Sequence, residues 1–193
     1  MNMPNKLTLL RIILVPFFIG ALYIDKAAPA FAGWKYFIAD IIFSAAALTD
    51  FADGYLARKN HQITNFGKLM DPLADKLLVC SAFIFFVQLN ITRAIPVIII
   101  IAREFLVTSV RLIAIETGTV IAANNWGKAK TVTQMLSIII TMLLYFMTYA
   151  FGLIPLNASR VVAEILIYAS TLITLISGFT YVWQNRKLFS DGV

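Results

Sequence analysis

The chain has 193 residues, of which 60% are hydrophobic and only 13% are charged, and its formal net charge is +6. Soluble domains carry about 25% charged residues, so this composition excludes an ordinary soluble domain and predicts a protein embedded in a membrane. A single cysteine and a single histidine exclude an intrachain disulfide and a zinc site built from several thiolates or imidazoles. In a membrane protein a basic excess reflects topology and anionic headgroups, so no nucleic-acid partner is expected.

Six stretches of the chain are long and apolar enough to cross a bilayer as helices, which takes about 20 mainly apolar residues. Short polar segments, or segments with Gly and Pro, separate them. In chain order they cover residues 7–24, 34–57, 67–89, 93–115, 130–151 and 158–183. Because no internal repeat, low-complexity tract or long linker divides the chain, we predict one all-α transmembrane domain of six helices over residues 1–193.

Basic residues predict the orientation of these helices. If the N-terminus is cytoplasmic, ten basic residues lie at cytoplasmic helix ends and four at the opposite ends, as the positive-inside rule requires. The four are Lys26, Lys35, Arg93 and Arg160. An even number of helices returns the C-terminus to the starting side. We therefore predict a multi-pass protein of the cytoplasmic membrane with both termini in the cytoplasm.

The segment between the second and third predicted helices concentrates acidic residues. It reads TDFADGYLARKNHQITNFGKLMDPLADKL, residues 49–77. Four of the ten acidic residues of the chain lie in it: Asp50, Asp53, Asp71 and Asp75. Charges beside apolar helices are costly, and like charges repel each other, so these four carboxylates require positive charge to compensate them.

Helical geometry places these acids on one side of each helix. At 100° per residue, an arc of about 140° on the second helix carries two acids, two small residues and one base. They are Asp50, Asp53, Gly54, Ala57 and Arg58. On the third helix Gly67, Asp71 and Asp75 repeat every four residues and drift by only about 40° per step. Pro72 lets that helix either begin at Asp71 or run from Gly67 with a distortion. Acids beside small side chains leave room for a ligand close to the backbone.

Two facing helices that each supply a pair of carboxylates form an oxygen-rich site. Oxygen ligands without sulfur or imidazole favour Mg²⁺ or Mn²⁺, and Ca²⁺ is less suited to chemistry. Four carboxylates suit two divalent ions about 3.5–4 Å apart, the arrangement used in phosphoryl transfer. Arg58 on the same face would bind a phosphate oxygen. The alternative is a charge cluster that only solvates a turn, but such a cluster does not need glycine and alanine in register with the acids.

Eight residues between positions 50 and 75, in the pattern D-x2-D-G-x2-A-R-x8-G-x3-D-x3-D, resemble the signature of the CDP-alcohol phosphotransferase family without a departure. PNKLTLLR, residues 4–11, resembles the start of the first helix in that family. REFLVTSVR, residues 103–111, and NNWGKAKT, residues 124–131, resemble the branch that makes phosphatidylglycerophosphate.

The resemblance implies six transmembrane helices, usually in a homodimer, with an active site in a cavity open to the cytoplasm. Members displace CMP from a CDP-linked donor with an alcohol, and here the donor would be CDP-diacylglycerol. The four aspartates would surround two divalent metal ions, and Asp75 would also be the general base for the acceptor hydroxyl. The residues beside the nucleotide and its phosphates would be Gly54, Ala57, Arg58 and Gly67. Asn5 and Thr8 would either contact the nucleotide or cap the first helix.

The acceptor pocket is expected to carry charge opposite to that of the acceptor. Five basic residues are candidates for binding an acceptor phosphate: Arg11, Arg103, Arg111, Lys128 and Lys130. Arg103 lies in the fourth apolar helix, where a charge is costly unless it is paired or functional. The two lysines are expected in the turn after that helix. Glu104 is not expected to pair with Arg103, because adjacent residues on a helix do not face each other.

The number of cations bears on the identity of the acceptor. Serine or a neutral alcohol does not call for so many, whereas glycerol 3-phosphate fits the charge and inositol phosphate fits it almost as well. The REFLVTSVR and NNWGKAKT segments favour glycerol 3-phosphate.

A function of another class, a cation or proton transporter with an ion path along the carboxylates, is disfavoured because the acids cluster toward one face and no repeat is evident.

Overall fold

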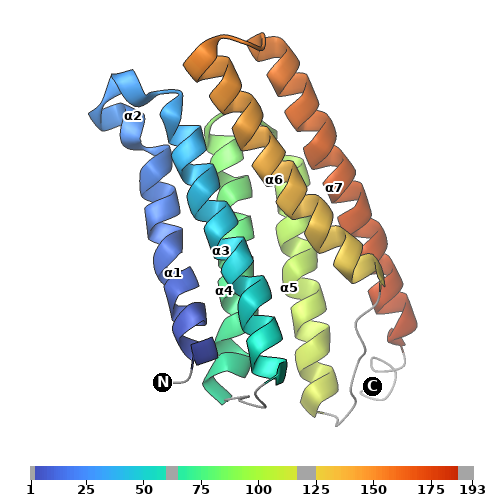
Figure 1. The fold of residues 1–193 in the computed structure, drawn as a ribbon. Coiled ribbons are helices and arrows are strands. Elements are labelled where there is room, and N and C mark those ends of the chain that lie inside the picture. The colour runs from blue at the N-terminus through green and yellow to red at the C-terminus, as the bar shows by residue number, and fades with distance from the viewer. Residues whose placement is uncertain (1–2, 60–64, 117–124, 187–193) are drawn as a thin grey trace.

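The computed structural model describes the backbone of residues 3–59, 65–116 and 125–186, and within these ranges it leaves the side chains of residues 3–8, 26, 27, 29, 50–73, 75, 112, 115 and 116 undescribed. All regular elements of the described residues are helices (Figure 1). Its elements are α1 (Met3–Leu22), α2 (Ile24–Ala27), a 3-10 turn (Pro29–Phe31), α3 (Trp34–Lys59), α4 (Asn65–Gln88), α5 (Ala94–Glu116), α6 (Asn125–Phe151) and α7 (Leu156–Gln184). The prediction of an all-α chain with six long helices is confirmed.

The ends of the helices differ from the predicted ends by up to five residues. α6 begins at Asn125 rather than at residue 130, so Lys128 and Lys130 lie in its first two turns and not in a preceding loop. α4 runs from Asn65 through Pro72, so it does not begin at Asp71. Hydropathy marks only the apolar part of a helix, and a helix can continue into polar residues on either side of it.

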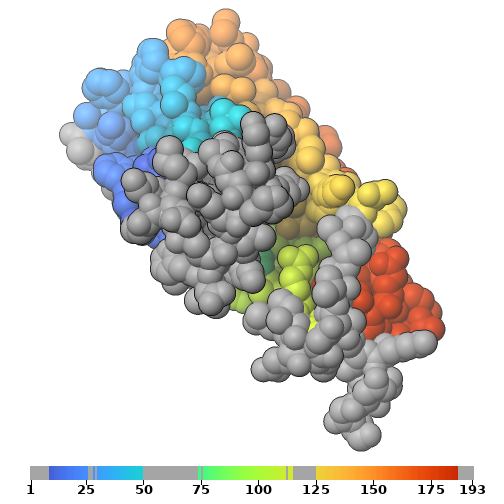
Figure 2. Space-filling view, turned by 60° about the horizontal axis from the view of Figure 1, so that its bottom comes forward, coloured from blue at the N-terminus to red at the C-terminus, as the bar shows by residue number. Residues whose placement is uncertain are grey.

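The six long helices pack as one bundle (Figure 1). α1 packs on α3 and α4, α6 packs on α3 and α7, and α5 packs on α4 and α7. α1 and α4 begin at the lower end of the bundle in Figure 1, and α3, α5 and α7 end there. We call this the acid end, because the backbone of all four aspartates of residues 49–77 lies there. Figure 2 looks toward it and shows α1 and α7 on opposite sides.

The interior of the bundle is of two kinds. Between α1, α3, α4 and α6 the core is mainly apolar, and Phe18, Phe43, Phe83 and Met142 are fully buried. The buried residues of α6 and α7 instead include many hydroxyl and amide groups. They are Gln134, Ser137, Thr141, Ser159, Ser170, Thr171, Thr174 and Ser177.

Two hydrogen bonds cross between α6 and α7. The Gln134 amide donates to Thr174 Oγ1 at 3.0 Å, and the Thr148 and Ser159 hydroxyls lie 2.6 Å apart. Small and hydroxylated side chains at helix contacts are typical of membrane proteins, because lipid supplies no hydrophobic force to hold helices together. The last two helices are therefore joined by polar contacts that their apolar composition did not predict.

Within the described residues, α6 and α7 have the length and apolarity expected of helices that cross a membrane. α1 and α4 contain shorter apolar stretches, Leu9–Leu22 and Lys76–Gln88. Apolar side chains also cover the outer surface, as at Leu172 and Phe179 of α7, which are 59% and 69% exposed. An apolar outside around a partly polar inside suits a lipid environment. That all six long helices cross the membrane stays a prediction.

Gly33 sits where the start of α3 meets the end of α6. A Cβ atom at Gly33 would lie 2.6 Å from the backbone nitrogen of Ala150, and a backbone cannot yield as a side chain end can. We expect Gly33→Ala to push the two helices apart and to lower the free energy of unfolding by about 1–3 kcal/mol. Thermal unfolding in detergent measures this loss.

The matched control is Gly20→Ala on α1, where an added Cβ meets nothing within 4 Å. Alanine has a higher helix propensity than glycine, so this variant should be as stable as the wild type or more stable. Equal midpoints for Gly33→Ala and the wild type would contradict the close approach of α3 and α6.

Candidate active site

The backbone brings the four aspartate positions to one end of two contacting helices. Asp50 and Asp53 lie in about the last three turns of α3, and Asp71 and Asp75 in about the first three turns of α4. α3 and α4 contact each other and both pack on α1. The side chains of these aspartates are outside the described residues, as are those of six other predicted site residues: Asn5, Thr8, Gly54, Ala57, Arg58 and Gly67.

The helical register relates the acids of α3 to the core. Ala39, Phe43 and Ala46 are fully buried on α3. Asp50 follows Phe43 by seven residues and Ala46 by four, which places its Cα within about 40° of both around the helix axis. Asp53 follows Ala46 by seven residues, within about 20°. The two acid positions therefore continue the core-facing stripe of α3 toward its end.

The same relation holds on α4. Leu78, Ala82 and Phe86 are buried on this helix, at 2%, 0% and 0% exposure. Asp71 precedes Leu78 by seven residues and Ala82 by eleven, within about 20° of each. Asp75 precedes Ala82 by seven residues and Phe86 by eleven, again within about 20°. All four acid positions thus continue buried helix faces at the acid end.

A carboxylate donor set of this kind fits a hard divalent cation, which takes oxygen ligands. No group of three or more His, Cys, Asp or Glu side chains that could hold a metal lies in the part of the chain whose side chains are described. The described residues therefore offer no competing metal site.

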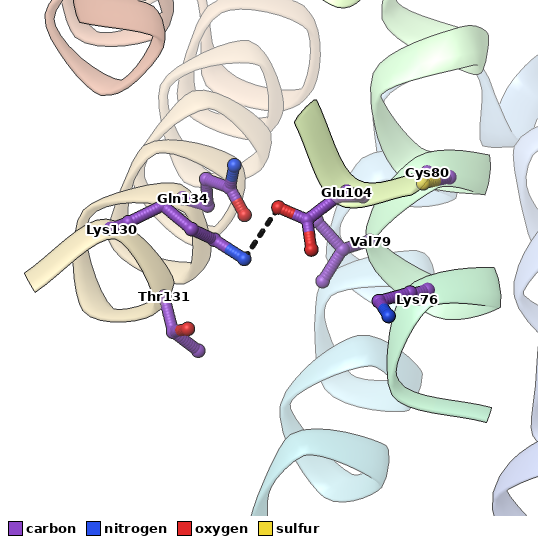
Figure 3. A pocket seen from close by; sticks show the side chains of 7 residues that line it. All are labelled: Lys76, Val79, Cys80, Glu104, Lys130, Thr131 and Gln134. Carbon is purple, nitrogen blue, oxygen red and sulfur yellow. Dashed lines mark ion pairs between the residues drawn. The ribbon is translucent and has the colours of Figure 1, made fainter. Parts of the chain in front are cut away.

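A small pocket opens between α4, α5 and α6 near the acid end (Figure 3). Its lining residues are Lys76, Val79 and Cys80 from α4, Glu104 from α5, and Lys130, Thr131 and Gln134 from α6. Lys76 follows Asp75 directly and lies about 100° further round α4. The pocket therefore begins about a quarter-turn from the position of Asp75.

Glu104 is at the centre of the polar contacts in this pocket. Its Oε1 atom accepts a hydrogen bond from Lys130 Nζ at 2.6 Å, and both side chains are 8% exposed. Figure 3 shows these two groups facing each other from α5 and α6. Oε1 also lies 3.4 Å from Arg103 Nη1, and Arg103 Nη2 donates to Ser177 Oγ on α7 at 2.7 Å. One chain of polar contacts therefore joins α6, α5 and α7.

The expectation that Arg103 and Glu104 do not pair was wrong. It considered only the directions of the two Cβ atoms, which do diverge on a helix. The Arg103 side chain is long enough to bring its guanidinium back to the neighbouring carboxylate. A buried arginine needs such a partner, because an uncompensated buried charge is strongly unfavourable.

The five basic candidates do not form one cluster. Lys130 lies inside the pocket, whereas Lys128 is exposed and lies about 200° away around α6. Arg111 is also exposed, near the end of α5, seven residues beyond Glu104 and on nearly the same face. Lys130 is therefore the candidate that this structure brings to the pocket.

The remaining two candidates lie elsewhere in the bundle. Arg103 is directed toward α7, where Gly178 makes room for it: a Cβ at Gly178 would lie 2.9 Å from Arg103 Cγ. Arg11 is only 1% exposed, on α1, which packs against α3 and α4.

Sequence reasoning did not include two polar residues of the pocket, Lys76 and Gln134. Lys76 Nζ donates to Thr108 Oγ1 on α5. Gln134 follows Lys130 by four residues, so the two share the buried face of α6. That spacing, a cation and an amide one turn apart in an apolar stretch, was a usable signal. Lys76 gave none beyond its place next to Asp75.

Known proteins similar to this chain support the same family over nearly its whole length. A sequence model of the family described as CDP-alcohol phosphatidyltransferase matches residues 1–180. The chain is 39% identical over 194 residues to the "CDP-diacylglycerol--glycerol-3-phosphate 3-phosphatidyltransferase" of Bacillus subtilis, covering 95% of each chain. A protein of the same name from Haemophilus influenzae is 37% identical over 197 residues, covering 100% of this chain and 97% of its own. Another from Rickettsia felis is 35% identical over 188 residues, covering 97% of each. Together with the uninterrupted signature from Asp50 to Asp75, these matches show that the chain belongs to the CDP-alcohol phosphatidyltransferase family of transferases.

Proposed function

We propose that the protein transfers a phosphatidyl group from CDP-diacylglycerol to glycerol 3-phosphate, giving phosphatidylglycerophosphate and CMP. The names of the relatives above state this donor and this acceptor. The observation that carries the reaction centre is the helical register. The positions of four aspartates continue the buried faces of α3 and α4 at the acid end of the bundle.

The six long helices span the cytoplasmic membrane, with the acid end and both chain termini on the cytoplasmic side. This orientation is supported by the excess of basic residues at that end and by the apolar outer surface of the bundle. It gives the water-soluble acceptor and the departing CMP access to the site, while the acyl chains of the donor stay in the bilayer. A homodimer is expected from the family resemblance.

The four aspartates would hold two divalent ions, Mg²⁺ or Mn²⁺. When bound, such ions supply positive charge that stabilises the donor phosphates and the leaving CMP. Carboxylates alone suit these ions, which prefer oxygen ligands. Beside them, Gly54, Ala57 and Gly67 leave room for the nucleotide, and the Arg58 guanidinium binds its phosphates in the fork geometry that favours arginine. Asn5 and Thr8, at the start of α1, are further candidates for contacts to the nucleotide.

Asp75 is the general base. The hydroxyl of the acceptor attacks the phosphorus on the diacylglycerol side of the donor, and Asp75 accepts the proton that this hydroxyl loses. The bond between that phosphorus and the oxygen bridging to CMP breaks, and CMP leaves with the bonding electrons. A positioned base of this kind contributes about 10²–10⁴-fold to a rate.

The acceptor phosphate binds in the pocket between α4, α5 and α6, where Lys130 is its cation. Support comes from the two ammonium groups that line this pocket and from its beginning about a quarter-turn from Asp75. Arg111 and Lys128 are exposed toward the acid end and attract the anionic acceptor. Arg11 is buried and the Arg103 side chain is 10% exposed, and both add positive potential to the bundle interior.

The deciding experiment measures CMP release by the purified protein from CDP-diacylglycerol with Mg²⁺ or Mn²⁺. We expect CMP only when glycerol 3-phosphate is added, because the names of the relatives state this acceptor. Serine and inositol phosphate are the comparison acceptors. CMP release with inositol phosphate or serine in place of glycerol 3-phosphate would make the protein a sister enzyme. Cation flux in liposomes without CMP release would favour a transporter.

A further inference from the structure

Glu104 is a buried carboxylate that the proposed reaction does not otherwise use. It is 6% exposed, on α5, in a chain that is 60% hydrophobic. A carboxylate away from water is costly unless it is paired and hydrogen-bonded. Two cations contact its Oε1 atom, Lys130 on α6 and Arg103 on α5. The question is what this carboxylate does for the two cations.

A comparison of Lys128 with Lys130 shows how the Glu104 carboxylate affects where a lysine ammonium lies. Both are on α6, two residues apart, yet Lys128 is exposed whereas the Lys130 side chain is 8% exposed. A lysine stem of four methylene groups ordinarily carries its ammonium out to water. Lys130 keeps its ammonium inside the pocket, 2.6 Å from Glu104. The carboxylate therefore fixes the point at which this positive charge meets the pocket.

The ion pair is not needed simply to join the helices. α6 is already tied to α7 by the Gln134–Thr174 hydrogen bond, and α5 to α7 by the Arg103–Ser177 hydrogen bond. Buried ion pairs contribute little net stability, because desolvation offsets their attraction. The Glu104–Lys130 pair lies on the wall of a pocket rather than in the packed core (Figure 3).

The charge of the cluster also suits an anion. Two cations, Arg103 and Lys130, share one carboxylate, so the three side chains together keep a net positive charge. Lys76, which lines the same pocket from α4, adds a second ammonium. An acceptor phosphate entering the pocket would therefore meet donors held in fixed positions rather than flexible lysine ends.

We infer that Glu104 is a positioning residue for the acceptor: it holds the Lys130 ammonium in the pocket between α4, α5 and α6, ready to bind the acceptor phosphate. This inference rests on the proposed function. Glu104 touches neither donor nor acceptor, and it acts through Lys130. Its loss should therefore weaken acceptor binding and leave donor binding unchanged.

The test is a double-mutant cycle on the KM for glycerol 3-phosphate, with Glu104→Gln, Lys130→Met and the double variant. We expect Glu104→Gln to raise this KM roughly 10- to 100-fold, the range of a hydrogen bond to a charged group. The KM for CDP-diacylglycerol should stay within about twofold. Because Glu104 acts through Lys130, the double variant should have the same KM as Lys130→Met. Glu104→Asp keeps the charge but shortens the reach, and it should fall between Glu104→Gln and the wild type.

Lys35→Met is the matched control. Lys35 forms an ion pair with Asp25, also at 2.6 Å, at the end of the bundle opposite the acid end. Its loss should leave the KM for glycerol 3-phosphate unchanged. A wild-type KM in Glu104→Gln, or in Glu104→Asp if the glutamine variant does not fold, would overturn the inference. The inference would also be overturned if the fold-changes in this KM caused by Glu104→Gln and Lys130→Met multiplied in the double variant. Wild-type protein that releases no CMP with glycerol 3-phosphate would overturn the proposed function itself.

Discussion

Asp75→Asn is expected to lower kcat for CMP release by about 100- to 10,000-fold, the contribution of a positioned general base. Asparagine keeps the size of the side chain and one oxygen ligand, but its amide cannot take the proton from the acceptor hydroxyl. The KM for CDP-diacylglycerol should change much less than kcat. Initial rates of CMP release at saturating glycerol 3-phosphate give both values.

Asp40→Asn is the matched control for that variant. Asp40 is a buried aspartate on another long helix, 6% exposed, and it lies ten residues before Asp50 on α3. At 1.5 Å per residue this is about 15 Å from the acid end along the helix. We expect its kcat to match that of the wild type. Full activity in Asp75→Asn would remove the role of Asp75 as base.

The long helices were predictable because each contains a nearly continuous apolar run. All six overlap their predicted ranges. What hydropathy could not give was the polar ends: α1 begins at Met3 and α6 at Asn125, several residues before the apolar runs begin. The additional residues at the start of α6 determine which lysine reaches the pocket, because they place Lys128 and Lys130 on a helix and on opposite sides of it.

The acid stripes were predictable for a different reason. Asp50, Asp53, Asp71 and Asp75 lie close together in sequence, so helical spacing alone assigns them to one face of each helix. The pocket brings together residues from α4, α5 and α6 that lie up to 58 positions apart. Contacts between Glu104 and Lys130 depend on how these helices pack, and periodicity within a single helix contains no information about that packing.

The buried contacts of α7 also depend on packing. Ser177 and Gly178 look like ordinary small residues of an apolar helix, and composition gives them no role. In the bundle they receive the Arg103 side chain, one by a hydrogen bond and the other by leaving room for its stem. A cation in the fourth long helix was therefore visible in the sequence as a costly charge, but the helix that compensates it was not.

Asp53→Asn is expected to lower CMP release by about 100-fold or more at a metal concentration that saturates the wild type. The cause of this loss of activity should differ from the cause in Asp75→Asn. Asp53 continues the core-facing stripe of α3 at the acid end, and its proposed role is to hold a divalent ion. An amide in its place keeps a neutral oxygen but loses the charge that hard cations favour. The concentration of Mg²⁺ or Mn²⁺ needed for half-maximal rate should therefore rise, and excess metal should restore part of the activity.

A metal titration of the two variants separates the two roles. Asp53→Asn should recover toward the wild-type rate as the concentration of Mn²⁺ rises, because the lost step is binding of the ion. Asp75→Asn should recover much less, because added metal cannot replace a proton acceptor. Chelation of divalent metal from the wild type should abolish CMP release, and restored metal should return it. Unchanged half-activating metal concentrations in Asp53→Asn would mean that the acid stripe of α3 does not bind the ion. Any divalent ion would then have to be held by Asp71 and Asp75 of α4 alone.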